Sequence, residues 1–259
     1  MDAREYSGGA RAVYRAANPG LYQLVKHQPV LDQFFSASAD FSRCERARTR
    51  LDEEIESRQA RIAASDREEA TFVGDAVEFV LETGTLPAGF ARSVAALDRR
   101  REAEEIRVLA AMRDDAMGRL ESIVESNLDG AFTHLHALVV QVVDQGRLQP
   151  WAAEPGADTT SGALADRYSE LRATQQALLR QVGFGSGDWR SAAIVRNVTE
   201  FWPGWHRFCR TGSSLPPWPA DDLRQQFTWM VTHPDAEVWV PTPTALDEFI
   251  ETAAPPRDR

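Results

Sequence analysis

A long heptad pattern constrains the fold of this chain more than any other feature. When a and d positions are counted on a 3.5-residue period from Phe34, ten of the fourteen positions are apolar. No Gly or Pro interrupts the sequence between Val30 and Val73. The pattern predicts an amphipathic helix that begins after Pro29, where a missing N–H is tolerated. The apolar positions are Phe34, Ala37, Phe41, Cys44, Leu51, Ile55, Ile62, Phe72, Ala76 and Phe79.

Three charged residues, Arg48, Arg58 and Glu69, interrupt this apolar seam. They either fix the register of the seam or mark a bend in the helix. Gly84 is the expected end of the helix, because Gly followed shortly by Pro is the usual order of stop signals. It begins a six-residue connection, GTLPAG, whose length suits two antiparallel neighbours.

A second amphipathic helix is expected from about Phe90 to Gly146, with apolar residues at a mean step of about 3.6 residues. Residues 131–143 are apolar almost all round, which predicts that this end lies inside a globular body. The charged residues 98–115 are expected to project from it. At about 1.5 Å per residue, the predicted hairpin would reach roughly 60–80 Å.

The rest of the sequence differs in composition from the hairpin. All seven tryptophans follow residue 150, and a polar linker rich in Pro, Gly and Thr precedes most of them. We therefore predict an all-α fold: a long antiparallel, coiled-coil-like helical hairpin and a compact Trp-rich helical domain. The expected divisions are 1–28 with short helices, 29–148 for the hairpin, 149–162 for the linker, 163–254 for the Trp-rich domain and 255–259 for a disordered tail.

Charge and composition exclude some classes of function. The net charge of −10 and the pI of about 5.1 make nucleic-acid binding an unexpected function. The sequence contains no run of 18 apolar residues, so no membrane span is predicted. The N-terminal sequence has no apolar stretch typical of a secretory signal, so we expect a cytoplasmic protein or a particle assembled in a bacterial host. Lys26 is the only lysine, and this bias together with abundant Ala suggests a GC-rich bacterial or bacteriophage genome.

Candidate chemical sites in the sequence are weak. The loop GFGSGD at 183–188 resembles a phosphate cradle, but neither a preceding strand nor a following Gly-Lys-Ser/Thr is present. His206 and Cys209 could supply half of a metal site, yet the other candidates, Cys44, His27, His134, His136 and His233, have no paired spacing. We predict no catalytic residues, no cofactor and no metal.

Protein interfaces are the better prediction. Two helices cannot bury both of their seams alone, so association with other copies is expected unless C-terminal helices of the same chain cover them. The aromatic and Pro-rich stretch 201–241 is either the core of its domain or a partly exposed interface for a protein partner. The candidate interface residues are Phe34, Phe41, Leu51, Ile55, Ile62, Phe72, Trp202, Trp205 and Trp218.

Three hypotheses for function follow. The first is a non-enzymatic structural or assembly protein that oligomerises through the hairpin, such as a component of a bacteriophage or another large complex. The second is a monomeric adaptor that binds a protein partner through its Trp/Pro-rich C-terminal domain. The third is an enzyme of unknown class with a site in the C-terminal half.

Overall fold

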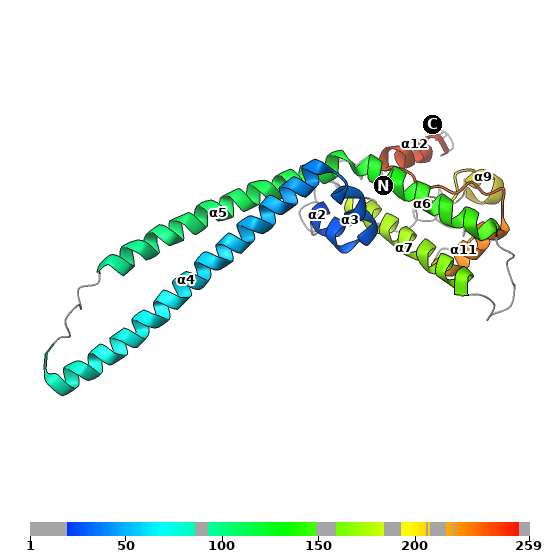
Figure 1. Ribbon diagram of the computed structural model, residues 1–259. Helices are drawn as coiled ribbons and strands as arrows, with labels where there is room; N and C mark the ends of the chain where they lie inside the picture. The colour runs from blue at the N-terminus through cyan, green and yellow to red at the C-terminus, as the bar shows by residue number, and fades with distance from the viewer. Residues whose placement is uncertain are drawn as a thin grey trace. The chain divides into compact units, whose positions relative to one another are not determined.

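The computed structural model of this chain describes residues 20–85, 93–148, 159–183, 193–205, 207, 216–219 and 221–253. Of these residues 82% are helical, and the described part of the chain contains no strand, which confirms the all-α class. Val195 and Val238 form one isolated antiparallel bridge. The chain divides into two units: residues 37–123 form one, and residues 1–36 with 124–259 form the other (Figure 1).

The first unit is the hairpin, formed by α4 (Ala39–Thr83) and most of α5 (Ser93–Ser126). The hydroxyl of Ser38 accepts a hydrogen bond from the Phe41 N–H at 3.5 Å and caps the start of α4. Gly84 follows the last turn of α4 with a φ of 69°, a left-handed conformation that glycine adopts at little cost. The predicted end of the first arm is therefore correct, and its 45 residues span about 67 Å.

The predicted start of this arm was wrong. Residues 29–36 form a separate helix, α3 (Pro29–Ser36), which belongs to the other unit. The break between α3 and α4 at the Ser38 cap contains no Gly or Pro, so the sequence has no breaker residue that would predict it. Phe34 consequently lies outside the seam of the hairpin. Its ring stacks on His134 of α6, with centroids 5.2 Å apart and an interplanar angle of 29°.

The second unit combines both ends of the sequence. Its helices are α2 (Leu21–His27), α3, α6 (Leu128–Leu148), α7 (Thr159–Gln181), α9 (Val198–Phe201), α11 (Leu223–Thr232) and α12 (Pro243–Ala253). Helices α6 and α7 lie side by side, and α11 packs against both (Figure 1). Phe132, Leu135 and Val139 of α6 are fully buried, in agreement with the burial predicted for residues 131–143, but Leu138 and Val140 on the other side of the helix are only half-buried.

Close packing of α6 on α11 depends on Gly146. A Cβ placed on this glycine would lie 2.7 Å from Val231 Cγ2 and 2.8 Å from Phe227 Cζ. The next residue, Arg147, donates from Nη2 to the carbonyl oxygens of Met230, His233 and Ala236, at 3.0–3.3 Å. The bonds to Met230 and His233 satisfy carbonyls at the C-terminal end of α11, which an α-helix leaves without internal partners, and the bond to Ala236 joins the following turn to α6.

The boundaries between domains also differ from the expected ones. Residues 124–148, predicted to be part of the hairpin, pack with the C-terminal half instead, because α6 buries its apolar residues against α7 and α11. Helix α7 begins at Thr159, inside the predicted linker, of which residues 149–158 lie outside the described part. Residues 193–197 are not helical, and their backbone is hydrogen-bonded to that of residues 237–239. The predicted tail and residues 1–19 also lie outside the described residues.

Candidate functional site

The residues considered for chemistry do not form a common site in the described part of the chain. His206, Cys209 and all of the GFGSGD loop except Gly183 lie outside it. Within it, no group of three or more His, Cys, Asp or Glu side chains is arranged to hold a metal ion. His134 contacts an aromatic ring, and His136 Nδ1 accepts a 3.3 Å hydrogen bond from the backbone N–H of Val240. None of the described helices is both long and apolar enough to cross a membrane.

The most unusual polar group is a buried cation, Arg172 on α7, whose exposed fraction is 1%. Its guanidinium donates only to neutral acceptors. These are Tyr168 Oη at 3.0 Å, Gln175 Oε1 at 2.8 Å, and the backbone oxygens of Ala193 at 3.2 Å, Ile194 at 3.3 Å and Trp239 at 2.8 Å. Because a buried charge is costly unless it is fully hydrogen-bonded, this arrangement holds the two segments of the isolated bridge against α7.

The pKa values of two groups near Arg172, Tyr168 and His136, are shifted by burial. Burial raises the pKa of Tyr168, whose hydroxyl donates to Gln226 Oε1 at 2.8 Å. Burial, with smaller contributions from the positive charges of Arg172 and Arg196, lowers the pKa of His136. Both shifts favour the neutral form and are explained by the core in which these groups lie. The network is a structural element, since the donors and acceptors named here bond to one another and to the backbone.

The tryptophans proposed as an interface lie in the core. Trp202, Trp205 and Trp218 have exposed fractions of 3%, 0% and 2%. Their rings contact one another, with centroids 5.5 Å apart for Trp202 and Trp205 and 5.7 Å apart for Trp202 and Trp218. Side chains buried in this way do not offer a surface to a partner. The core alternative is therefore correct for these three residues, because large rings packed together bury much apolar area.

In the hairpin, the apolar residues of the seam become less buried along α4, from its start towards the connection. Near its start, Phe41 and Ile55 have exposed fractions of 0% and 7%, and on α5 Ala116 and Leu120 are also buried. Leu51, Ile62 and Phe72 are half-buried. The seam predicted from the heptad pattern thus exists from Phe41 onward, but its apolar residues become more exposed towards the connection.

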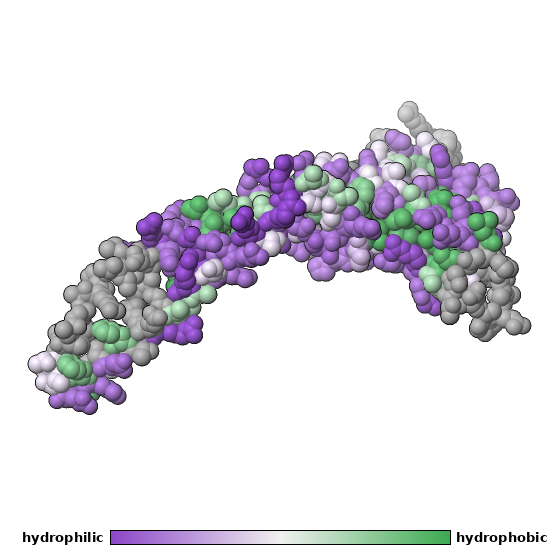
Figure 2. Space-filling model, viewed as in Figure 1, coloured by the Kyte–Doolittle hydropathy of each residue, from purple (hydrophilic) through white to green (hydrophobic). Residues whose placement is uncertain are grey.

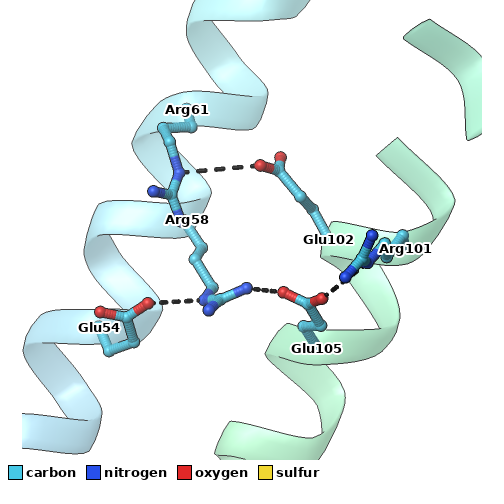
Figure 3. Close-up of polar contacts among 6 residues, drawn as sticks. All are labelled: Glu54, Arg58, Arg61, Arg101, Glu102 and Glu105. Carbon is cyan, nitrogen blue, oxygen red and sulfur yellow. Dashed lines mark hydrogen bonds and ion pairs between the residues drawn. The ribbon is translucent and has the colours of Figure 1, made fainter. Parts of the chain in front are cut away.

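Arg58, one of the charged exceptions in the seam, joins the two helices. Its guanidinium forms an ion pair with Glu105 of α5 and a second one with Glu54 at 2.8 Å (Figure 3). Glu105 also accepts from Arg101 at 3.1 Å, and one turn along α4 Arg61 lies 3.7 Å from Glu102. A polar layer of this kind favours one register of two helices over others, which is the alternative that fits Arg58.

These ion pairs show that α5 is too short to cover α4. In an antiparallel pair of helices, the numbers of residues that lie opposite each other have a constant sum. The pairs Arg58–Glu105 and Arg61–Glu102 both give 163, so they belong to one register. At that register Ser93, the first residue of α5, lies opposite residue 70 of α4. Helix α4 continues to Thr83 and therefore extends past the start of α5 by residues 71–83, which we call the overhang. The overhang is about 20 Å long.

Apolar side chains of the overhang are exposed. The exposed fractions of Val73, Val77, Phe79 and Leu81 are 49%, 54%, 42% and 81%. Apolar residues appear at the surface of the hairpin near the end of α4, beside polar ones (Figure 2). A further exposed pair, Val108 and Met112, lies one turn apart on α5. By the register above, Val108 and Met112 lie opposite residues 55 and 51 and are therefore separate from the overhang. Exposed apolar side chains that gather on one helix end are characteristic of protein–protein contact sites.

Acidic residues accompany this apolar surface. Asp75, Glu78 and Glu82 are exposed on the overhang. Between Arg67 and Arg92 the sequence contains five acidic residues and no basic residue. The overhang is therefore an apolar and acidic helix end, in contrast to the paired charges of the Arg58 layer.

Phe72 and Phe79 are on the predicted seam, whereas Val73, Val77 and Leu81 are not among the predicted interface residues. The sequence carried no clear signal for them, because the two predicted arms were of nearly equal length and the overhang follows from the register of the Arg58 and Arg61 ion pairs. Comparisons with known protein families, with curated proteins and with solved structures found no match to this chain.

Proposed function

We propose that this chain is a non-enzymatic assembly protein whose copies associate through the hairpin, and that the overhang is the main contact. The observation that supports this proposal is the exposure of Val73, Val77, Phe79 and Leu81 on a helix whose earlier seam is buried. Phe79 continues the seam of α4, whereas Val73, Val77 and Leu81 recur every four residues on another face of the same helix. We propose a helix of a second copy as the partner of this helix end. A subunit of a larger complex is the corresponding biological role.

The size of the apolar surface suggests a moderate affinity. Full burial of a Val, Leu or Phe side chain contributes about 1.5–3 kcal/mol, so half-exposed side chains would contribute about 1 kcal/mol each. Four such residues on each of two copies would contribute about 8 kcal/mol. Association itself costs about 4–15 kcal/mol, so the overhang gives measurable self-association only at micromolar concentrations or with additional contacts. Val108 and Met112 are available for such contacts.

Sedimentation velocity of the full chain tests this proposal. We expect a concentration-dependent mass above the monomer value of 28.9 kDa. Val77→Asp places a charge within the apolar surface and should shift the protein to monomer. Ser57→Asp is the matched control, because it adds the same charge to an exposed position of α4 outside the overhang. A wild-type protein that remains a monomer at 100 µM would refute the proposal, as would equal effects of the two substitutions.

The two alternative functions have less support. An adaptor that binds through Trp202, Trp205 and Trp218 would need these side chains at the surface, and they are buried. An enzyme would need polar groups that face a substrate, whereas the donors of Arg172 already bond to protein acceptors.

A further inference from the structure

We propose that acid releases α12 from the second unit, because protonation of His136 breaks a hydrogen bond to the segment that leads into this helix. The proposal concerns the second unit alone, so it is independent of the proposed self-association through the hairpin. Its basis is a bond whose acceptor can be titrated: the Val240 N–H donates to His136 Nδ1 at 3.3 Å. A backbone N–H can only donate, so Nδ1 carries no proton in this arrangement.

Val240 lies in a segment that is anchored on two sides. The Trp239 N–H donates to Ile194 O at 3.0 Å, and Trp239 O accepts from Arg172 of α7 at 2.8 Å. On the other side, the Val240 N–H reaches α6 through His136. Among the hydrogen bonds that anchor this segment in the described structure, the bond to His136 lies nearest to the start of α12. Loss of this bond therefore acts first on the end of the segment that holds α12 in place.

Protonation of His136 places an N–H where the N–H of Val240 needs an acceptor. Both ring nitrogens of a charged imidazole are donors, so the bond is lost and the buried Val240 N–H keeps no partner. The charged groups whose fields reach His136 are Arg172 of α7 and Arg196 beside the bridge, and both are positive. Among the described residues, neither α3, α6, α11 nor α12 contributes a compensating negative charge at His136. A charged His136 therefore favours an arrangement in which residues 240–242 have moved away from α6.

The release of α12 uncovers aromatic rings of the core. In the docked helix, Leu246 is fully buried. The Phe249 ring lies against Trp205 and Trp239, with centroids 5.6 Å and 4.9 Å apart. Undocking withdraws both side chains of α12 from these contacts. The second unit then exposes in acid an aromatic surface that it covers at neutral pH.

The size of the effect is limited by the single proton. Once α12 is undocked, His136 has its ordinary pKa of about 6.5, whereas burial lowers this pKa in the docked state. The undocked state therefore binds the proton more readily, and undocking is favoured as pH falls below about 6.5. Between pH 7.5 and 5.5 the undocked fraction should rise by up to about tenfold.

Hydrogen–deuterium exchange of the full chain at pH 7.5 and 5.5, corrected for the intrinsic exchange rates, tests this proposal. We expect residues 240–253 of the wild type to lose up to about tenfold in protection at pH 5.5, while α6 and α7 keep theirs. In His136→Asn, whose side-chain oxygen can accept from the Val240 N–H at either pH, the protection should be equal at both. The matched control is His134→Asn, which removes a histidine of the same helix that stacks on Phe34, and it should keep the wild-type response.

Equal protection of residues 240–253 at the two pH values in the wild type overturns the proposal. A loss of protection that is equal over α6, α7 and α12 also overturns it, because the whole unit then opens together. The same holds if His134→Asn abolishes the response as His136→Asn does. If His136→Asn does not fold, NMR titration of the wild type replaces it: the Val240 amide signal must change with the same midpoint as the His136 ring, and a different midpoint contradicts the proposal.

Discussion

Replacement of Arg172 by Met tests whether the buried hydrogen-bond network holds the compact unit together. Methionine is of comparable length but has no donor, so the substitution removes five hydrogen bonds. Ala193 O and Ile194 O retain other bonds, from Gln175 Nε2 and the Trp239 N–H. Gln175 Oε1 and Trp239 O have no other hydrogen bond in the described structure.

The expected loss of stability follows from the two acceptors that Arg172→Met leaves without a partner, Gln175 Oε1 and Trp239 O. An acceptor that is buried without a partner costs about 1–3 kcal/mol, so two of them cost about 2–6 kcal/mol. The desolvation of the guanidinium, which the native fold includes as an unfavourable contribution, is removed at the same time and offsets part of this cost. We therefore expect the free energy of unfolding to fall by about 3 kcal/mol.

Urea denaturation followed by tryptophan fluorescence is the suitable assay, because all seven tryptophans follow residue 150 and lie outside the hairpin unit. For a urea dependence of about 2 kcal/mol per molar, a loss of 3 kcal/mol lowers the midpoint by about 1.5 M. Arg180→Met is the matched control, since Arg180 lies on the same helix but is exposed. If the midpoint of Arg172→Met moves by less than about 0.3 M, the network contributes little and the reasoning is wrong.

Three further predictions concern single residues. Gly146→Ala should destabilise the compact unit by about 1–3 kcal/mol, because its Cβ would overlap Phe227, and thermal unfolding without a decrease in midpoint would contradict this. Gly118→Ala should instead stabilise α5 by about 0.5–1 kcal/mol, because no atom lies within 4 Å of the added Cβ, and a lower helicity by circular dichroism would refute it. Burial lowers the pKa of His136 below its unfolded value of about 6.5. As pH falls below about 6.5, His136 therefore binds a proton more readily in the unfolded chain than in the folded one, and the free energy of unfolding should decrease. The variant His136→Asn keeps a side-chain oxygen that can accept from the Val240 N–H. The difference in urea midpoint between pH 7.5 and pH 5.5 should be smaller in this variant than in the wild type. An equal difference would exclude His136 as the cause.

The helical class and the end of α4 could be predicted because they depend on local signals. A heptad pattern over several turns predicts a helix, and Gly84 followed by Pro87 predicts its end. The start of α4 was missed because Ser38 is one polar residue among many, and only its bond to the Phe41 N–H identifies it as a cap. Serine is common both at caps and on exposed helix faces, so its position in the sequence does not separate the two roles.

The burial of the tryptophans could not be decided from the sequence. Large aromatic residues beside prolines are found both in cores and at interfaces, and the local pattern is the same in each case. The structure separates them through contacts between distant segments, such as the Trp202 ring against Trp218 and the Trp205 ring against Phe249. Arg172 is a similar case: nothing near it in the sequence indicates that its partners include the backbone of residues 193, 194 and 239.

The exposure of the overhang depends on two features: the lengths of α4 and α5, which are local, and the register between the two helices, which is not. Each helix length can be estimated from its own sequence, but the overhang exists only because Arg58 pairs with Glu105 and not with an acidic residue elsewhere on α5. A slip of one heptad that moved α5 further along α4 would cover half of the overhang and leave apolar residues of the inner seam uncovered instead. The ion-pair layer and the exposed valines are therefore two parts of one arrangement. Substitutions that change this register should change self-association even though they lie outside the apolar surface.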